Sequence, residues 1–251
     1  MASGASGAGR MAEPAEILAA ARLALASGGP LAGRRVVITA GGTQEPLDPV
    51  RFLTNASSGK MGVALAEAAR DLGASVTLIY APLAVALPLG IGCVPVRTAV
   101  EMRDAVLACL PQTDVLIGAA AVADFRPADP AAQKIKKTPG QEDLPVRLVR
   151  NPDILAEVAA RRANIGWLKV VIGFAAETQD LLVNAAAKLA AKKLDIIVAN
   201  DVTEAGSGFG SDDNRVTLLF ADGRQEPLPI MSKGEVARRV CEAALALLEG
   251  R

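Results

Sequence analysis

The sequence contains no histidine. This absence excludes Ser-His-Asp and Cys-His nucleophile systems and zinc sites ligated by imidazole. It also removes the side chain that most often acts as a general base near neutral pH. Chemistry in this protein must therefore rely on lysine, carboxylate and amide side chains, on backbone N–H groups, and on groups that the substrates bring.

Cysteine is also scarce. Cys93, Cys109 and Cys241 are an odd number and lie far apart, without a C-x-x-C spacing. Such a set argues against a disulfide framework and against a zinc site. We expect these cysteines to be buried thiols in a reducing compartment.

A net charge and a long apolar run are missing as well. Lysine plus arginine and aspartate plus glutamate both total 27, so no overall basic field attracts a nucleic acid or a membrane surface. No stretch reaches the roughly 18 to 20 apolar residues of a membrane span, and the first residues do not follow the plan of a signal peptide. We expect a cytoplasmic protein with no nucleic-acid partner and no membrane partner.

Apolar residues are plentiful, at 51% of 251 residues, which is enough for a substantial core. Residues 1–32 predict a flexible tail rich in glycine, alanine and serine, then a short helix over 13–27 and a linker. Residues 33–251 would form the main domain, and one domain with an excursion fits the pattern better than two.

From residue 35 onward, short β-rich runs alternate with helical patterns. The expected strands cover 36–40, 75–80, 93–96, 114–118, 169–174 and 194–200, and the expected helices lie near 58–72, 99–110, 152–162, 179–193 and 232–249. This alternation predicts an α/β protein with a Rossmann-like, mostly parallel sheet and helices on both faces. Ligands in such sheets bind beyond the carboxyl ends of the strands, where the candidate residues should lie.

Two hairpins interrupt the alternation. KIKK (134–137) and LPVRLVR (144–150) predict a β-hairpin arm, over about residues 125–150, that projects from the sheet. RVTLLF (215–220) and the segment after it predict a second hairpin, with Asp222-Gly223 as its turn.

The connection between Ala40 and Ser57 is unusually long. It has about sixteen residues without an obvious strand or helix, where connections in α/β units usually take about 2 to 6. Its apolar residues and prolines predict an ordered, packed loop. It does not match the G-x-G-x-x-G dinucleotide fingerprint, which argues against an NAD enzyme, and it does not match the P-loop.

The end of this connection predicts an anion site. Ser57 and Ser58 are good N-cap residues, and Gly59 leaves backbone N–H groups open at the positive end of a helix, beside Lys60. The alternative is a plain helix cap followed by a solvated lysine.

Small residues follow a strand in GAAAVADF (118–125), where a flat ligand can approach the backbone. Asp124 would be placed there to bind a ribose hydroxyl or a metal ion, and the alternative is an aspartate that only forms a turn.

Four lysines are further candidates. Lys134 shares one face of an extended segment with Lys136, where both would clamp phosphates or only protect an edge strand from aggregation. Lys188 and Lys192 share one face of a helix, where surface solubility is the alternative role.

Together and in this order, the motifs resemble phosphopantothenoylcysteine synthetase, the ligase of coenzyme A biosynthesis. The resemblance covers Val36 to about Leu219 and rests on ITAGGTQEPLDPVRFLTNASSGKMG, AAAVADFRP followed by KIKK, NPDILAEV, GFAAET, and LDIIVANDV with GFGSDDN.

The resemblance implies a ligase that activates the carboxylate of 4′-phosphopantothenate with CTP, the nucleotide of the bacterial type, and releases pyrophosphate. The amine of L-cysteine then attacks the acyl-cytidylate, which gives 4′-phosphopantothenoylcysteine and CMP. This chemistry suits a chain without histidine, because the nucleotide supplies the leaving group. The protein must hold two anions together, which requires cations, Mg²⁺ and N–H donors.

The resemblance also assigns residues. Asn55 would donate its amide to the developing oxyanion, and Lys134 would neutralise charge during activation. The anion site predicted above from the residues themselves, Ser57, Ser58, Gly59 and Lys60, would bind one of the two anions beside them. Nucleotide contacts would come from Gly118, Ala119, Ala120, Asp124, Pro152, Asp153, Ile154, Leu155, Phe174, Lys188 and Lys192. Metal ligands are left open.

Family members of this kind are dimers in which the arm reaches towards the neighbouring subunit, so a homodimer is expected. ASGAGRMAEPAEILAA near the N-terminus resembles the closing residues of a flavin-dependent phosphopantothenoylcysteine decarboxylase. A decarboxylase domain is therefore an expected partner, whereas no flavin is expected in this chain, because the core of that enzyme is absent.

The sequence departs from the family pattern at Gln44, Ala56 and Gly210, where arginine, a larger polar residue and asparagine are more common. These departures bear on the shape of the substrate pocket. Two other functions stay open: a nucleotide-binding regulatory module without turnover, and a short-chain NAD(P) oxidoreductase.

Overall fold

The computed structural model describes residues 11–137, 139–140, 142–162, 166–177, 180–201 and 210–250. An eight-stranded sheet forms its centre, in the order β13-β12-β10-β9-β6-β1-β4-β5. These strands are β1 (Arg35–Ala40), β4 (Ser75–Tyr80), β5 (Gly92–Pro95), β6 (Val115–Gly118), β9 (Val170–Glu177), β10 (Ile196–Asp201), β12 (Val216–Phe220) and β13 (Gln225–Pro227).

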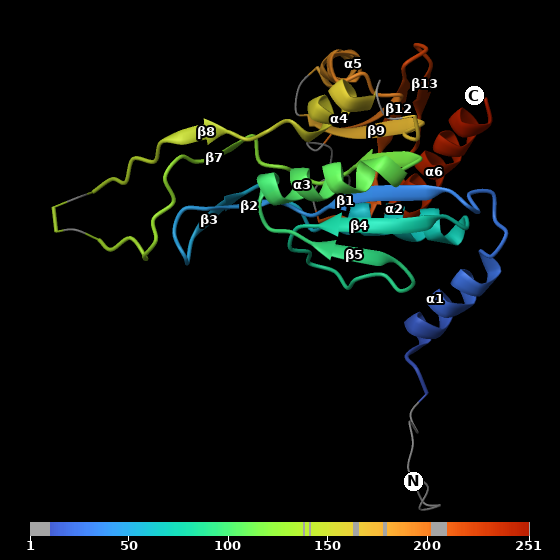
Figure 1. The fold of residues 1–251 in the computed structure, drawn as a ribbon, viewed down its shortest axis with the longest axis horizontal. Helices are drawn as coiled ribbons and strands as arrows, with labels where there is room; N and C mark the ends of the chain where they lie inside the picture. Colours follow the sequence, from blue (N-terminus) through green and yellow to red (C-terminus); the bar gives the residue numbers. More distant parts are fainter. Residues whose placement is uncertain are drawn as a thin grey trace, which may run out of the picture.

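The six strands from β10 to β5 are parallel, and β12 and β13 are added antiparallel at one edge. The helices are α1 (Pro14–Leu25), α2 (Lys60–Asp71), α3 (Ala99–Cys109), α4 (Ile154–Arg162), α5 (Leu181–Ala191) and α6 (Lys233–Glu249), with a short 3-10 helix η1 (Leu110–Gln112). The predicted Rossmann-like α/β fold is confirmed (Figure 1).

Alternating residues of the strands pack on opposite faces, as the period of two requires. Ile38 of β1 is fully buried in a cluster with Leu65 of α2 and Val240 of α6. Its neighbour Val37 belongs to the other cluster, with Met102 of α3 and Val158 of α4. The sheet is therefore covered on both faces, which explains why its strands read as nearly continuous apolar runs.

The projecting arm is present, but its paired strands differ from the prediction. The arm is closed by β7 (Phe125–Pro127) and β8 (Leu148–Arg150), which pair antiparallel, and it extends away from the sheet in Figure 1. Residues 134–137 are not in a strand, so the prediction that KIKK pairs with 144–150 is wrong. The alternation in KIKK therefore does not correspond to a paired strand.

The long connection after β1 also contains regular structure. β2 (Gln44–Pro46) and β3 (Phe52–Thr54) form a small antiparallel hairpin, so the prediction of a loop without secondary structure is wrong. These strands were missed because each has only three residues and Pro46 lies in one of them. The second predicted hairpin is confirmed as β12 paired with β13.

The remaining elements are two short strands, β11 (Asp213–Asn214) and β14 (Met231–Ser232). The short helix predicted over 13–27 is present as α1. Residues 1–10 of the predicted tail lie outside the described residues. Of the segments that carry the resemblance, residues 178 and 202–209 also lie outside them. Across the described ranges, no helix has both the length and the apolarity needed to cross a bilayer.

Candidate active site

A cavity of about 850 Å³ lies at the carboxyl edge of the parallel strands. Its walls come from β1, the end of the long connection, the start of α2, and the segments after β6 and β8. The second half of β9, the end of α5 and the start of α6 complete the lining. This volume is in the upper part of the range for small-molecule sites. The position is the one expected for a ligand in a parallel sheet.

Two loops form one wall by bonding to each other. The backbone of Thr43 donates to Ala121 O at 3.3 Å, and the backbone of Ala121 donates to Gly41 O at 2.8 Å. The hydroxyl oxygen of Thr43 accepts a 3.0 Å bond from the Ala123 backbone. The segment after β6 is therefore held by the segment after β1, as two extended chains beyond the end of the sheet.

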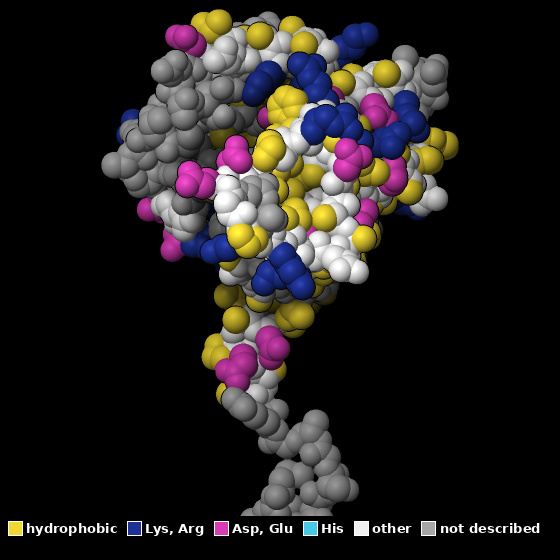
Figure 2. Space-filling view, turned by 90° about the vertical axis from the view of Figure 1, so that its left-hand side faces the viewer, with side chains coloured by type: hydrophobic (Ala, Val, Ile, Leu, Met, Phe, Trp, Pro, Cys, Tyr) yellow, Lys and Arg dark blue, Asp and Glu magenta, His cyan; other side chains and the backbone are white. Residues whose placement is uncertain are grey.

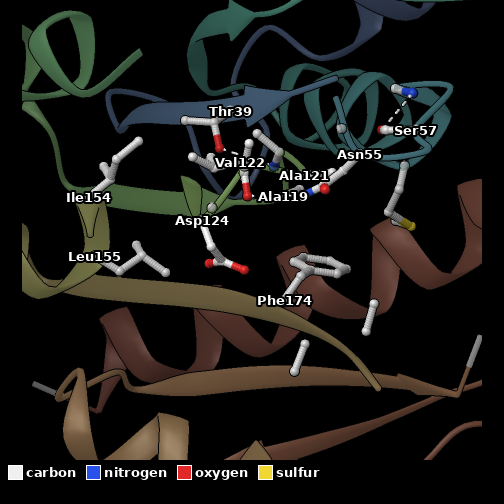
Figure 3. A pocket seen from close by; sticks show the side chains of 18 of the residues that line it. Thr39, Asn55, Ser57, Ala119, Ala121, Val122, Asp124, Ile154, Leu155 and Phe174 are labelled. Atoms are coloured by element: carbon white, nitrogen blue, oxygen red, sulfur yellow. Dashed lines mark hydrogen bonds between the residues drawn. The ribbon is translucent and has the colours of Figure 1, made fainter. Parts of the chain in front are cut away.

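Asn55 lies against this wall (Figure 3). Its Nδ2 donates to Val122 O at 3.1 Å, which leaves the second hydrogen of the amide group for another acceptor. The main chain of Asn55 passes close to Gly42, where a Cβ atom would stand 2.7 Å from Asn55 O. Only glycine allows this approach, so Gly42 serves the placement of Asn55, whereas its neighbour Gly41 has φ +81° and lies against Ala81 O.

The start of α2 forms a second wall, with Gly59 as its N-cap. Gly59 has φ +76°, and neither serine caps the helix, so the predicted capping by Ser57 or Ser58 is wrong. Their hydroxyl oxygens instead accept from the backbones of Gly59 at 3.3 Å and Lys60 at 3.5 Å. A left-handed N-cap leaves this role to glycine, because other residues rarely adopt that φ.

The alternative to an anion site was a helix cap followed by a lysine that contacts only solvent. Lys60 does not fit that alternative, because its ammonium group is bonded to other residues. Its Nζ donates to Gly210 O at 2.8 Å and to Asp212 Oδ1 at 2.7 Å. The Lys60 ammonium holds the pKa of the Asp212 carboxyl below its usual range. The lysine thus fastens residues 210–212 to the start of α2 while it also lines the cavity.

Figure 3 shows Asp124, Leu155 and Phe174 around a further part of the cavity. Leu155 fills the space over Gly118, since a Cβ atom there would lie 3.2 Å from Leu155 Cδ2. The open backbone for a flat ligand is therefore that of Ala119 and Ala120, which also line the cavity.

Lys188 of α5 and Lys192, the C-cap of that helix, line the same cavity. Lys192 Nζ lies 3.0 Å from Asp153 Oδ2, which ties the end of α5 to the start of α4. Pro152 and Ile154 on either side of Asp153 also belong to the lining. Sixteen of the seventeen predicted site residues are thus gathered around one cavity.

Lys134 is the exception. It is exposed and is not among the residues that line the cavity. It lies in the arm. Figure 2 shows the side of the molecule from which the arm projects, where Lys and Arg side chains are interspersed with Asp and Glu.

Sequence reasoning missed several lining residues, among them Lys233 and Asn214. Lys233 is the first residue of α6, and its Nζ donates to Asp213 O at 3.1 Å and to Ser211 O. Desolvation, followed by the charge of Lys60, lowers the pKa of Lys233. Asn214 is 3% exposed, and its Oδ1 has no hydrogen-bond partner among the described residues. The Ser232-x-x-Glu235 capping box before α6 was the available signal for Lys233.

Comparison with known proteins agrees with this geometry. Residues 31–247 match the family model described as the DNA/pantothenate metabolism flavoprotein C-terminal domain. The chain belongs to this family.

Curated relatives of this chain include the coenzyme A biosynthesis bifunctional protein CoaBC of Bacillus subtilis, which is 47% identical over 98% of this chain. The protein of the same name from Vibrio cholerae is 48% identical over 95% of this chain. The chain spans about 60% of the length of these relatives. Among solved structures, the C-terminal domain of a CoaBC protein is similar, with a TM-score of 0.74, 38% identity, and coverage of 89% of this chain and 100% of that chain.

Proposed function

We propose that this chain is a phosphopantothenate–cysteine ligase. It would activate the carboxylate of 4′-phosphopantothenate as an acyl-cytidylate and pass the acyl group to the amine of L-cysteine. The observation that carries the proposal is that one cavity is lined by Asn55, by the start of α2, by Asp124 and by Lys188 and Lys192. Similarity to the CoaBC proteins supports the same assignment.

In the first half-reaction, a carboxylate oxygen attacks the α-phosphorus of CTP and pyrophosphate leaves. The reactants are both anions, so their approach needs cations and N–H donors. We assign this role to Lys60, Lys188 and Lys192 in the cavity lining, with Lys134 of the arm neutralising charge during activation. Backbone N–H groups at the start of α2 add the positive end of a helix.

In the second half-reaction, the cysteine amine attacks the acyl carbon, CMP leaves, and the amine loses a proton. Charge develops on the former carbonyl oxygen in the transition state. We assign its stabilisation to Asn55, whose Nδ2 is oriented by Val122 O and keeps one hydrogen to donate.

Mg²⁺ would accompany the nucleotide. Within the part of the chain that the structure describes, no three acidic or cysteine side chains come together as a metal cage. Mg²⁺ commonly takes one or two carboxylates together with substrate phosphates and water. Asp124 is the candidate carboxylate, since it lines the cavity and forms no ion pair with the residues that the structure describes, and the triphosphate would supply other ligands.

We also infer that the protein is a homodimer and works beside a phosphopantothenoylcysteine decarboxylase domain. The relatives are bifunctional proteins longer than this chain, which supports the second inference. Sedimentation velocity would test the first.

The deciding experiment is pyrophosphate release from the chain with 4′-phosphopantothenate, comparing CTP with ATP, with and without L-cysteine. We expect release with CTP that depends on phosphopantothenate, and formation of 4′-phosphopantothenoylcysteine only when cysteine is added. Binding of CTP without any pyrophosphate release would identify a regulatory module instead. A thermal shift with NAD rather than CTP would indicate an oxidoreductase.

A further inference from the structure

The tip of the β2–β3 hairpin meets the arm at one aspartate. The side chain of Asp48 is 0% exposed. Its Oδ1 accepts from the backbones of Val50 and Arg51, both at 2.8 Å. Its Oδ2 accepts from Arg51 Nε at 2.9 Å, from Arg51 Nη2 at 2.5 Å, and from the backbone of Ile135 in the arm at 3.1 Å.

Arg51 binds the same residue of the arm from its other side. Arg51 Nη2 donates to Ile135 O at 2.9 Å, so both backbone groups of Ile135 are held by the Asp48–Arg51 pair. The Ala131 backbone adds a further link, donating to Leu47 O at 2.9 Å. Hydrogen bonds to ionised groups are about twice as strong as neutral ones, so this pair is a firm attachment for the arm.

The hairpin that bears Asp48 is itself anchored in the body of the domain. Glu45 is 1% exposed, and its Oε1 accepts from the Ala99 backbone at 2.9 Å, at the start of α3. The Gln44 backbone donates to Arg97 O at 2.8 Å. A continuous series of hydrogen bonds therefore leads from α3 through the hairpin to residue 135.

Residue 135 lies directly between Lys134 and Lys136. The Ile135 N–H that Asp48 binds belongs to the planar peptide group that joins Ile135 to Lys134. Fixing this group therefore restricts the direction from which the Lys134 side chain extends. Arg51 holds the pKa of Asp48 far below its usual range, with help from the backbone donors. The carboxylate thus stays ionised over the whole range in which an enzyme would be assayed.

We propose that Asp48 is a positioning residue for ligation: with Arg51 it holds the backbone at Ile135, so that the exposed Lys134 side chain extends from a fixed point of the arm when it neutralises charge during activation. This inference rests on the proposed function of Lys134. It adds a residue that lies outside the cavity lining and acts only through the arm.

The test is a double-mutant cycle on pyrophosphate release by the full chain. We expect Asp48→Asn to lower kcat by about 10- to 100-fold, the effect of misplacing a catalytic group by about 1 Å. KM for CTP should stay within about threefold, since the lysines of α5 are untouched. In a Lys134→Gln background, the same change should alter kcat by less than about twofold, because its effect passes through the lysine.

Two further variants complete the test: one breaks the same hydrogen bond from the arm, and one is a control. Ile135→Pro removes the backbone donor to Asp48 without touching the hairpin, and it should reproduce the loss even where Asp48→Asn folds poorly. Asp129→Asn is the matched control, since Asp129 is an exposed arm aspartate paired with Arg147 at 2.8 Å. It should leave kcat within about twofold.

A second readout is independent of activity. Trypsin cleaves after lysine unless proline follows, so cleavage after Lys136 and Lys137, which every variant allows, reports how firmly the segment is held. It should be faster in Asp48→Asn and Ile135→Pro than in the wild-type chain or Asp129→Asn. Equal losses of kcat in both backgrounds, or an unchanged rate of cleavage, would overturn the positioning role. If Lys134→Gln alone ligates at the wild-type rate, the proposed role of Lys134 itself is refuted. This single variant therefore separates that outcome from a failure of the positioning role of Asp48.

Discussion

Gly42→Ala tests whether the close approach of the two loops sets the position of Asn55. A Cβ atom at residue 42 would lie 2.7 Å from Asn55 O and 3.1 Å from Thr54 Oγ1. Because ordinary contact begins near 3.4 Å, the backbone at Asn55 must retreat by about 0.7 Å. Gly42 is not among the glycines with positive φ, so alanine adds this overlap and no backbone strain.

A displacement of about 1 Å costs roughly 10²-fold in rate, so we expect Gly42→Ala to lower kcat for ligation by about 10- to 100-fold. Overpacking of this kind also destabilises proteins by about 1–3 kcal/mol, which a thermal melt will register. KM for CTP should change little, since Lys188 and Lys192 lie on another element.

The assay is pyrophosphate release at saturating substrates, with Gly92→Ala as the matched control. A Cβ atom at Gly92 meets nothing closer than Val76 O at 3.5 Å, so this variant should keep wild-type kcat. A Gly42→Ala enzyme with a kcat within about twofold of wild type would refute the argument that this glycine places Asn55, since a real displacement costs far more.

Three further predictions concern single residues. Asn55→Asp should let the acyl-cytidylate accumulate in rapid-quench mass spectrometry, with transfer to cysteine slowed about 10²- to 10³-fold; normal turnover would contradict the oxyanion role. The pKa of Asp48 is depressed in the folded protein, so its contribution to stability is fully present above the unfolded pKa near about 3.9 and is lost as pH falls further. The gap in unfolding free energy between wild type and Asp48→Asn should therefore be constant from about pH 7 to 5 and shrink below about 4; a gap that widens in acid would refute this. Burial raises the pKa of Cys241 to about 12, so iodoacetamide at pH 8 should spare Cys241 in the native protein and modify it after unfolding, as peptide mapping would show.

The parallel sheet could be predicted because its strands are buried on both faces. Runs such as 36–40 and 194–200 are apolar at most of the positions that the sheet encloses, with Thr39 and Asp195 as buried polar exceptions. The rule that ligands bind at the carboxyl ends of strands then placed Asp124, Phe174 and the start of α2 near one another. Lys188 and Lys192 were harder to place, because i, i+4 spacing describes solvated helix faces equally well.

Other parts of the site could not be read from local pattern. Lys233 reaches the cavity because α6 packs beside α2, a contact between segments about 170 residues apart. Asn214 reaches it on β11, which pairs with β14 just before α6. The attachment of Ile135 to Asp48 joins residues 87 positions apart through a backbone group, and no side-chain pattern in KIKK encodes it. The alternation there was interpreted as a strand because alternating apolar and charged residues are typical of one.

The bonds between Thr43 and the segment after β6 bear on the energetics of binding. Ordering a free loop costs about 1–2 kcal/mol of conformational entropy per residue. Here the backbone at Ala119 to Ala123 is already ordered when the chain folds, so substrates need not bear that cost on binding. The affinity they gain from contacts with this wall then remains available to bring two negatively charged reactants together.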